Sequence, residues 1–194
     1  MRSQWRPAFI LLGYFTLLTG VIYPLVVTLI GGVLFHSQSE GSLVTRDGRV
    51  VGSKLIGQTF ADPGHFWGRL SATSPTPYNA ASSSGSNLGP LAPALTDAAG
   101  GRIQALRAAD STLTGPIPVD LVTSSASGLD PHVSPAGALI QTDRVARARG
   151  LDPAVVRALV QRHVEGRTLG LIGEPRVNVL MLNLALDSLA HATR

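Results

Sequence analysis

The stretch AFILLGYFTLLTGVIYPLVVTLIGGVLF, residues 8–35, decides the architecture of the chain because it contains no charged side chain. A helix of about 20 apolar residues crosses the hydrocarbon core of a bilayer, so this stretch can span it with some tilt. The alternative is a cleaved signal peptide, whose apolar region is roughly 7–15 residues long and ends at a small-residue cleavage site. Ser37-Gln38-Ser39 fits such a site poorly. We therefore predict an uncleaved transmembrane helix over residues 8–35.

The flanks of this helix indicate its orientation. Arg2 and Arg6 precede it, whereas the first basic residue after it is Arg46. Basic residues beside membrane helices stay on the cytoplasmic side. We expect residues 1–7 to be cytoplasmic and residues 36–194 to form one extracytoplasmic domain, which is periplasmic in a bacterium and long enough to bury a core.

The composition excludes some classes of function. The 194-residue chain has no cysteine, so an exported domain must be stabilised by burial without disulfides. Its net charge is +4, and Lys54 is the single lysine among 16 basic residues. No stretch alternates basic and aromatic residues as nucleic-acid-binding surfaces do. We therefore expect no nucleic-acid partner.

The first half of the predicted domain is rich in turns. Asp47-Gly48 predicts a hairpin turn, and residues 49–60 are expected to form one or two short strands. Residues 61–94 are dense in Pro, Gly, Ser and Asn, which is typical of irregular backbone or disorder. Three aromatic residues in this segment need burial, which favours an ordered loop: they are Phe66, Trp67 and Tyr78.

The second half is predicted to be mainly helical. Residues 95–109 have helical spacing, although two glycines weaken it, and residues 119–122 resemble a short strand. Ser134 is a favourable N-cap for a helix that ends at Gly150. Asp152-Pro153 begins another helix, whose apolar stripe includes His163, expected to be a core histidine. With a last apolar helix over residues 177–189, the sequence predicts a mixed α/β (α+β) domain.

The stretch TSSASGLDPHVSP, residues 123–135, contains the residue types of a hydrolase. A membrane-anchored serine hydrolase would use Ser127, Asp130 and His132. The G-x-S-x-G turn that exposes many catalytic serines is missing from the sequence, and Asp-Pro and Ser-Pro pairs are typical of turns and helix caps. We predict a structured turn. The hydrolase and an anchored ligand-binding module remain alternatives.

Metal and nucleotide chemistry have little support in the sequence. The five histidines form no H-x-x-x-H pair and have no cysteine beside them. Phosphate-binding loops of the G-x-x-x-x-G-K-[ST] type do not occur, and neither does an Asp-Lys-Thr-Gly run, the site of aspartyl-phosphate formation in ion pumps. We expect no catalytic residue, no metal site and no covalently bound cofactor.

Two further patterns concern contacts with partners. Arg144, Arg147 and Arg149 are predicted to form a solvated face near a helix C-terminus, with partner binding as the alternative. In the membrane segment, residues at steps of three and four would share one helix face, and their mostly small side chains would allow close packing against another membrane helix. This predicted seam consists of Gly13, Thr16, Gly20, Pro24, Val27 and Gly31.

Four segments carry a resemblance to a known family. They are FWGRLSAT (66–73), SSSGSNLGP (82–90), SGLDPHVSP (127–135) and LIGEPRVNVLMLNLALD (171–187). Their order, after an N-terminal membrane span, is similar to the C subunit of the Kdp potassium-transporting P-type ATPase over essentially the whole chain. Leu70 stands where that family usually has proline, and Ser84 where glycine is common.

The resemblance implies a single-pass subunit of the bacterial inner membrane with its large domain outside. Its partners would be a potassium-binding, channel-like subunit and an ATP-hydrolysing subunit, so that ATP and potassium are handled by the complex. The family is also credited with raising the ATP affinity of the hydrolysing subunit. A domain outside the membrane would achieve this only through conformational coupling, and assembly of the complex is the role we favour.

The resembling segments also supply a candidate partner or ion-entrance surface. It comprises Trp67, Arg69, Asn87, Asp130, His132, Glu174 and Arg176. Asp120, Asp130 and Glu174 would add negative potential near an ion entrance, over a range of about 10 Å.

Overall fold

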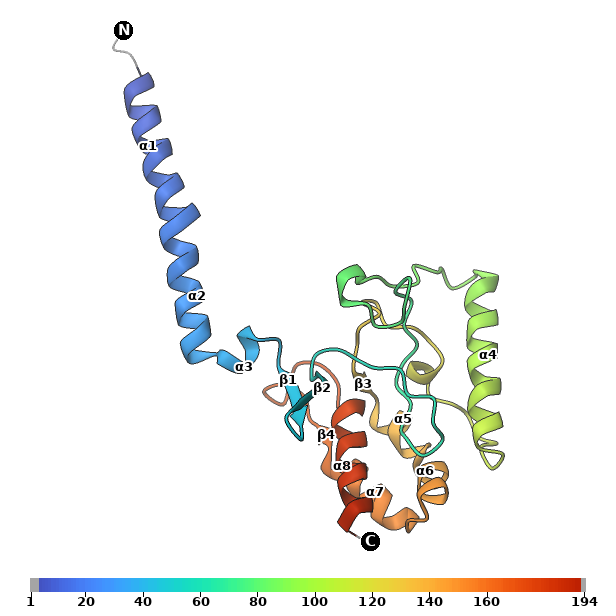
Figure 1. The fold of residues 1–194 in the computed structure, drawn as a ribbon. Coiled ribbons are helices and arrows are strands. Elements are labelled where there is room, and N and C mark those ends of the chain that lie inside the picture. The colour runs from blue at the N-terminus through green and yellow to red at the C-terminus, as the bar shows by residue number, and fades with distance from the viewer. Residues whose placement is uncertain (1–3, 193–194) are drawn as a thin grey trace. The chain divides into compact units, whose positions relative to one another are not determined.

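The computed structural model describes residues 4–192 (Figure 1). By their contacts the residues divide into two compact units, 1–43 and 44–194. Arg2, one of the two arginines used above to predict orientation, lies outside the described residues.

The first unit is a continuous helix over Trp5–Leu34, followed by the short helix α3 (His36–Ser39). The long helix consists of α1 (Trp5–Leu17), the π-helical segment η1 (Leu18–Ile22) and α2 (Tyr23–Leu34). The helix has 30 residues, and its most apolar 18-residue window has a mean hydropathy of 2.2. No residue of that window is buried. At 1.5 Å per residue the helix is about 45 Å long, which exceeds the hydrocarbon thickness of a bilayer. The predicted N-terminal apolar helix is therefore confirmed.

The π-helical segment was not predicted, and Pro24 explains it. Proline has no N–H group, so Pro24 cannot donate the regular α-helical hydrogen bond to the carbonyl of Gly20. Just before it, the N–H of Tyr23 donates to the carbonyl of Leu18, five residues earlier. The Thr19 hydroxyl donates to the carbonyl of Phe15 at 2.7 Å, which keeps this polar group satisfied on an apolar helix.

The body of the protein, residues 44–192, combines short strands with helices. Its elements are β1 (Leu43–Arg46), β2 (Arg49–Ser53), η2 (Ala80–Ser82), α4 (Pro93–Ala109), η3 (Val119–Leu121), β3 (His132–Val133), α5 (Pro135–Leu139), α6 (Thr142–Arg149), α7 (Pro153–Arg162), β4 (Val164–Glu165), β5 (Arg176–Asn178) and α8 (Val179–Ala192). The mixed α/β prediction is confirmed.

The strands form two small sheets. β1 and β2 are a hairpin around Asp47 and Gly48, whose φ angles of 52° and 74° match the turn type that favours glycine. The order of the second sheet is β3-β5-β4, and both pairs are antiparallel. In this sheet Val177 lies opposite Val133 on one side and Val164 on the other.

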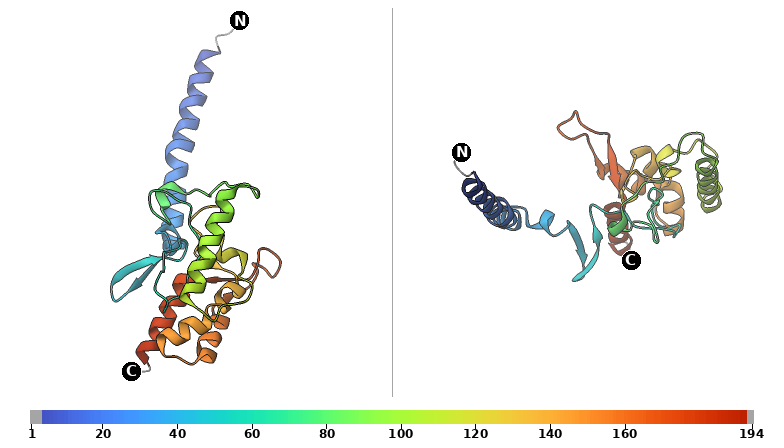
Figure 2. Two further views of the ribbon diagram at one scale, coloured as in Figure 1. Left: turned by 90° about the vertical axis from the view of Figure 1, so that its right-hand side faces the viewer. Right: turned by 90° about the horizontal axis from the view of Figure 1, so that it is seen from above.

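The helices cover this sheet and enclose the core. α6 packs against α7, α7 against α8, and α5 against β5, while α4 lies at the edge of the body (Figures 1 and 2). Fully buried side chains come from loops as well as from helices, and the largest include Phe66, Leu106, Leu121, Leu182 and Leu186. The predicted order of residues 61–94 is confirmed, because Phe66 and Trp67 are buried and Tyr78 is half-buried.

Most predicted helices are confirmed, with three differences among the predicted elements. Residues 177–178 belong to strand β5, so the last helix begins at Val179 and not at residue 177 as predicted. Residues 119–121 are a 3₁₀ helix, so the predicted strand was wrong. The helix predicted from Ser134 to Gly150 is broken after Leu139, although Ser134 caps its start and Gly150 adopts a left-handed conformation at its end.

Candidate functional site

The segment FWGRLSAT is held by two side-chain amides from distant parts of the chain, Asn183 on α8 and Gln141 in the turn before α6. The N–H of Phe66 donates to Oδ1 of Asn183 at 2.8 Å, and Nδ2 of Asn183 donates to the Phe66 carbonyl at 3.0 Å. Gln141 binds the backbone of Trp67 in the same manner, at 2.8 and 3.1 Å. Buried backbone groups need such partners. The two amides therefore make the hydrogen bonds that a neighbouring strand would otherwise make with this segment.

Two arginines lie close to the Trp67 ring. The guanidinium carbons of Arg102 and Arg144 are 5.0 and 4.8 Å from the ring centroid, within the range of cation–π attraction. Arg144 is itself buried and donates to Oε1 of Gln141 and to the carbonyl of Pro63. Burial lowers the pKa of Arg144 to about 10. The indole nitrogen of Trp67 donates to the carbonyl of Asp62 at 3.0 Å.

Two residues after Trp67, Arg69 forms an ion pair with Asp130 of the predicted turn. Its Nη1 is 3.1 Å from Oδ2 of Asp130, and Oδ1 of Asp130 lies 3.1 Å from Nδ1 of His132. Burial opposes ionisation of Asp130, but hydrogen bonds from His132 and Arg69 outweigh it and lower the pKa of this carboxyl. Asp130 also accepts the N–H of His132 at 3.0 Å. The carboxylate thus connects two loops and shapes the turn.

The turn at residues 127–128 connects three of the resembling segments. Gly128 has a φ of 68°, and a Cβ atom there would lie 2.5 Å from Cγ2 of Thr73 and 2.6 Å from the carbonyl oxygen of Ser84. The Ser71 hydroxyl donates to the Gly128 carbonyl at 2.7 Å, and the N–H of Ser84 donates to the Ser127 carbonyl at 3.0 Å. Only glycine fits this crowded, left-handed position without strain.

The fourth segment completes the same region. His132 pairs with Asn178 in the sheet, and the N–H of Val179 donates to the carbonyl of Pro131 at 2.9 Å. Beyond the strand, the N–H and hydroxyl of Ser134 both donate to Asp120, at 2.6 and 3.1 Å. All four segments identified in the sequence therefore meet around residues 127–134.

The predicted structural reading of this turn agrees with the contacts of its polar groups. Ser127, Asp130 and His132 line one cleft of about 580 Å³. The Ser127 hydroxyl, however, accepts the N–H of Leu129 at 3.1 Å, and no hydrogen bond joins Ser127 to His132 in the described part of the chain. Asp130 and His132 are thus paired with each other, while Ser127 contacts the backbone of its own turn.

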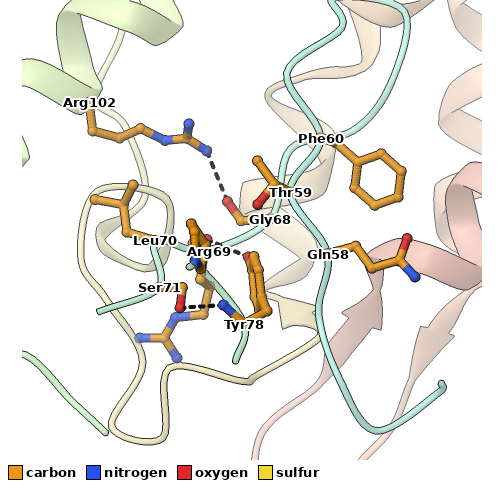
Figure 3. Close-up of a pocket in the computed structure, with 10 residues that line it drawn as sticks. Gln58, Thr59, Phe60, Gly68, Arg69, Leu70, Ser71, Tyr78 and Arg102 are labelled. Carbon is orange, nitrogen blue, oxygen red and sulfur yellow. Dashed lines mark hydrogen bonds between the residues drawn. The ribbon is translucent and has the colours of Figure 1, made fainter. Parts of the chain in front are cut away.

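A small cavity of about 130 Å³ lies beside Arg69 (Figure 3). Tyr78 closes one side, with its hydroxyl donating to the Arg69 carbonyl at 2.6 Å and its N–H donating to the Ser71 hydroxyl at 2.8 Å. Across the cavity, Nη2 of Arg102 donates to the Gly68 carbonyl at 2.9 Å. Burial raises the pKa of Tyr78, so its hydroxyl stays protonated at neutral pH. The cavity is lined by groups that hold the FWGRLSAT loop in shape.

Most residues of the candidate partner or ion-entrance surface do lie together. Five of the seven candidates line one open cleft of about 370 Å³: Arg69, Asp130, His132, Glu174 and Arg176. Asp120 lines the same cleft. Asn87 is exposed on a separate loop with a φ of 52°. Trp67 is only 7% exposed and belongs to the core. Its aromatic side chain packs against Arg102 and Arg144 and is not among the residues that line this cleft.

The charges of this cleft are mostly paired inside the protein. Asp130 pairs with Arg69, Glu174 with Arg167 at 2.8 Å, and Arg176 with Glu165 at 3.1 Å. These ion pairs reduce the negative potential that the sequence predicted for this region. The cleft is therefore a polar surface of mixed charge.

The predicted solvated face of arginines was wrong for two of its three members. Arg144 is buried against Trp67. Arg149 is mostly buried and forms an ion pair with Asp187 at 2.7 Å. Arg147 is exposed and pairs with Asp110. Helix spacing alone did not reveal these burials, because the groups that receive the arginines come from a distant loop and from α8.

Sequence reasoning also missed the two amide clamps. A signal for Asn183 was present, since it is a polar residue within the apolar run VLMLNLAL of the last helix. Buried polar groups are normally hydrogen-bonded, so Asn183 required a partner. No comparable signal marks Gln141, which lies where one helix was expected to continue.

Comparisons with known proteins agree with the resemblance of the four segments. The sequence model of the family described as "K+-transporting ATPase, c chain" matches residues 5–188. Two curated relatives named potassium-transporting ATPase KdpC subunit are each 62% identical to this chain. That of Polaromonas naphthalenivorans aligns over 97% of this chain and 96% of its own length, and that of Sorangium cellulosum over 96% and 98%. A third, from Methylococcus capsulatus, is 59% identical over 97% of this chain and its own full length.

Proposed function

The chain belongs to the KdpC family, the c chain of K+-transporting ATPases, and we propose that it is a non-catalytic accessory subunit that assembles and stabilises this transporter. Its partners would be the potassium-binding, channel-like subunit and the ATP-hydrolysing subunit that the family resemblance implies. The observation that carries the proposal is the match over 97% of the chain at about 60% identity.

The contacts of the polar turn at residues 123–135 support a non-catalytic role. The groups that a hydrolase would use are engaged in holding backbone, with Ser127 accepting from Leu129 and Asp130 accepting from His132. What these contacts provide is a fixed arrangement of loops around a polar cleft. Such a surface is suited to binding another protein with little loss of conformational entropy.

The orientation is the second part of the proposal. The apolar helix Trp5–Leu34 would anchor the chain in the bacterial inner membrane with its N-terminus in the cytoplasm. The body would then lie in the periplasm, on the side opposite to cytoplasmic ATP. Any rise in the ATP affinity of the hydrolysing subunit would reach it through the complex, by conformational coupling.

The membrane helix would contribute a packing face. A Cβ atom built on Gly13, Gly20 or Gly31 meets nothing within 4 Å, so no contact within the described chain requires these residues to be glycine. Their small size would instead serve the close approach of a neighbouring membrane helix. The π-helical turn Leu18–Ile22 rotates the residues that follow it relative to regular α spacing. The predicted seam would therefore consist of two offset halves, before and after this turn.

Purification of the transporter tests the proposal. The chain would carry a C-terminal tag and be expressed together with the other subunits, and the detergent extract would be analysed for co-eluting proteins and potassium-stimulated ATP hydrolysis. We expect both large subunits to co-elute, and we expect the ATPase activity to fall when the chain is omitted. A chain that elutes alone, or a transporter equally stable and active without it, contradicts the proposal.

A further inference from the structure

The segment between β4 and β5 projects from the body as a long hairpin loop (Figure 2). Its end carries three aliphatic side chains that are almost free of contacts, although residues of this type are normally buried. Leu169 is 86% exposed, Leu171 83% and Ile172 66%. These three residues are called the hairpin tip below.

The hairpin tip is held in a defined shape. Thr168 and Ile172 exchange backbone hydrogen bonds of 2.9 and 3.0 Å across the loop. Closer to the body, Arg167 donates to both carboxylate oxygens of Glu174, and Arg176 pairs with Glu165 on the neighbouring strand. The charges of the hairpin are thus neutralised by one another, which leaves an uncharged apolar end on a supported stem.

We propose that the hairpin tip inserts into an apolar groove on another protein subunit of the K+-transporting ATPase. This inference rests on the proposed function, and it deepens that function by naming the surface that docks. The groove would be lined by aliphatic or aromatic side chains. The two acidic and two basic side chains of the stem balance one another. The rim of the groove therefore needs neither a positive nor a negative net charge to receive the hairpin.

Two other occupants fit the hairpin tip less well. Segments that bind lipid surfaces use tryptophan, tyrosine and basic side chains, whereas residues 168–173 contain none of these. A second copy of the chain would need about 800 Å² of surface from each partner for a stable interface. Three aliphatic side chains offer much less. A tethered subunit can use so small a contact because the membrane helix already keeps its body near the partner, at a high effective concentration.

The absence of cysteine from the sequence allows a direct test by thiol labelling. Leu171→Cys would be introduced into the full-length chain, and Leu91→Cys, at an aliphatic position that is 95% exposed outside the hairpin, is the matched control. Each variant would be expressed with and without the other subunits, and its rate of reaction with a maleimide measured in membranes. We expect labelling at position 171 to slow about tenfold or more when the other subunits are present, as water is excluded from a packed contact, while position 91 is unaffected.

The outcomes separate this inference from the proposed function. Free labelling at position 171 in an intact complex overturns the inference and leaves the proposed function standing. Slow labelling at position 171 in the chain expressed alone also overturns it, because lipid or a second copy would then cover the tip. If the wild-type chain does not co-purify with the large subunits, the proposed function itself fails. As a second measurement, Leu171→Asp should lower the yield of co-purified subunits at least about fivefold relative to Leu91→Asp; equal yields contradict the inference.

Discussion

Asn183 and Phe66 exchange two hydrogen bonds although 117 positions separate them in the sequence. One side-chain amide satisfies both backbone groups of Phe66, at the point where the loop enters the core. Together with Gln141, which binds Trp67 in the same way, it fixes the position of the FWGRLSAT segment relative to helices α6 and α8. The polar cleft of the candidate site is built on this loop.

Asn183→Leu should therefore destabilise the body. The replacement leaves the buried N–H and carbonyl of Phe66 without partners, and each loss costs about 1–3 kcal/mol in the free energy of unfolding. Thermal unfolding of the detergent-solubilised chain measures the effect, with Trp67 fluorescence as the reporter in a Trp5→Phe background, since these are the two tryptophans of the sequence. The control is Gln104→Leu at an exposed amide of α4. A melting temperature that falls equally in both variants contradicts this role for Asn183.

Asp130 should make the stability depend on pH. Its pKa is lowered in the folded protein, where hydrogen bonds from His132 and Arg69 outweigh the cost of burial. A carboxyl of this kind contributes stability above its unfolded pKa of about 3.9, and the contribution is lost as the pH falls through the lower folded pKa. Asp130→Asn should then cost about 1–2 kcal/mol at pH 7 and progressively less below about pH 4.

Unfolding by denaturant across pH 3–7 would check this. Asp97→Asn, at an exposed carboxyl of α4, should leave the curve unchanged. Some acid dependence should remain in every variant, because the pKa of Asp110 is also lowered: burial raises it, but hydrogen bonds from Thr112 and Arg147 outweigh this cost. A constant difference between wild type and Asp130→Asn at all pH values would show that Asp130 is not the titrating group.

Gly128→Ala should disrupt the turn that joins three loop segments. The new methyl group would lie 2.5 Å from Cγ2 of Thr73, at a φ of 68° that side chains rarely adopt. We expect a loss of about 1–3 kcal/mol. Gly115→Ala, where a methyl group would meet nothing within 4 Å, is the matched control. The measurement is the melting temperature, and equal values for the two variants would mean that the turn tolerates a side chain.

The membrane helix gives a prediction about assembly. Gly13→Leu combined with Gly20→Leu should reduce co-purification of the large subunits, because the added side chains prevent close approach of a neighbouring helix. Gly32→Leu adds the same side chain outside the predicted seam, at a position equally free of contacts within the chain, and should leave the yield unchanged. Equal yields from the double variant and the control would show that the seam is not a packing face.

The sequence predicted the elements that are determined by residues close together in the chain. The uncharged run predicted the long apolar helix, Asp47-Gly48 predicted the hairpin, and Ser134 caps α5 by accepting the N–H of Gly137 at 2.9 Å. Asp152 likewise caps α7 at 2.8 Å. Each of these features depends on residues within a few positions of one another, which is why a pattern could reveal them.

The features that were missed depend on long-range contacts or on competition for hydrogen bonds. Gln141 interrupts the helix predicted to end at Gly150, because its side chain donates to the Gly137 carbonyl at 2.9 Å while its own N–H donates to Ala138. Residues 119–121 have strand-like side chains, yet the N–H groups of Leu121 and Val122 bond locally within a 3₁₀ turn. Arg144 is buried because the Trp67 ring and the carbonyl of Pro63 receive it, and both lie in a loop far from Arg144 in the sequence.

The claim on which the account depends is that an uncleaved helix holds the body outside the cytoplasmic membrane. Protease digestion of intact spheroplasts, with epitopes at both termini of the chain, tests it most directly. We predict that the C-terminal epitope is lost while the N-terminal epitope survives on a protected fragment that contains the membrane helix. A body that resists digestion until the membrane is permeabilised, or a mature chain without the N-terminal epitope, would contradict the account.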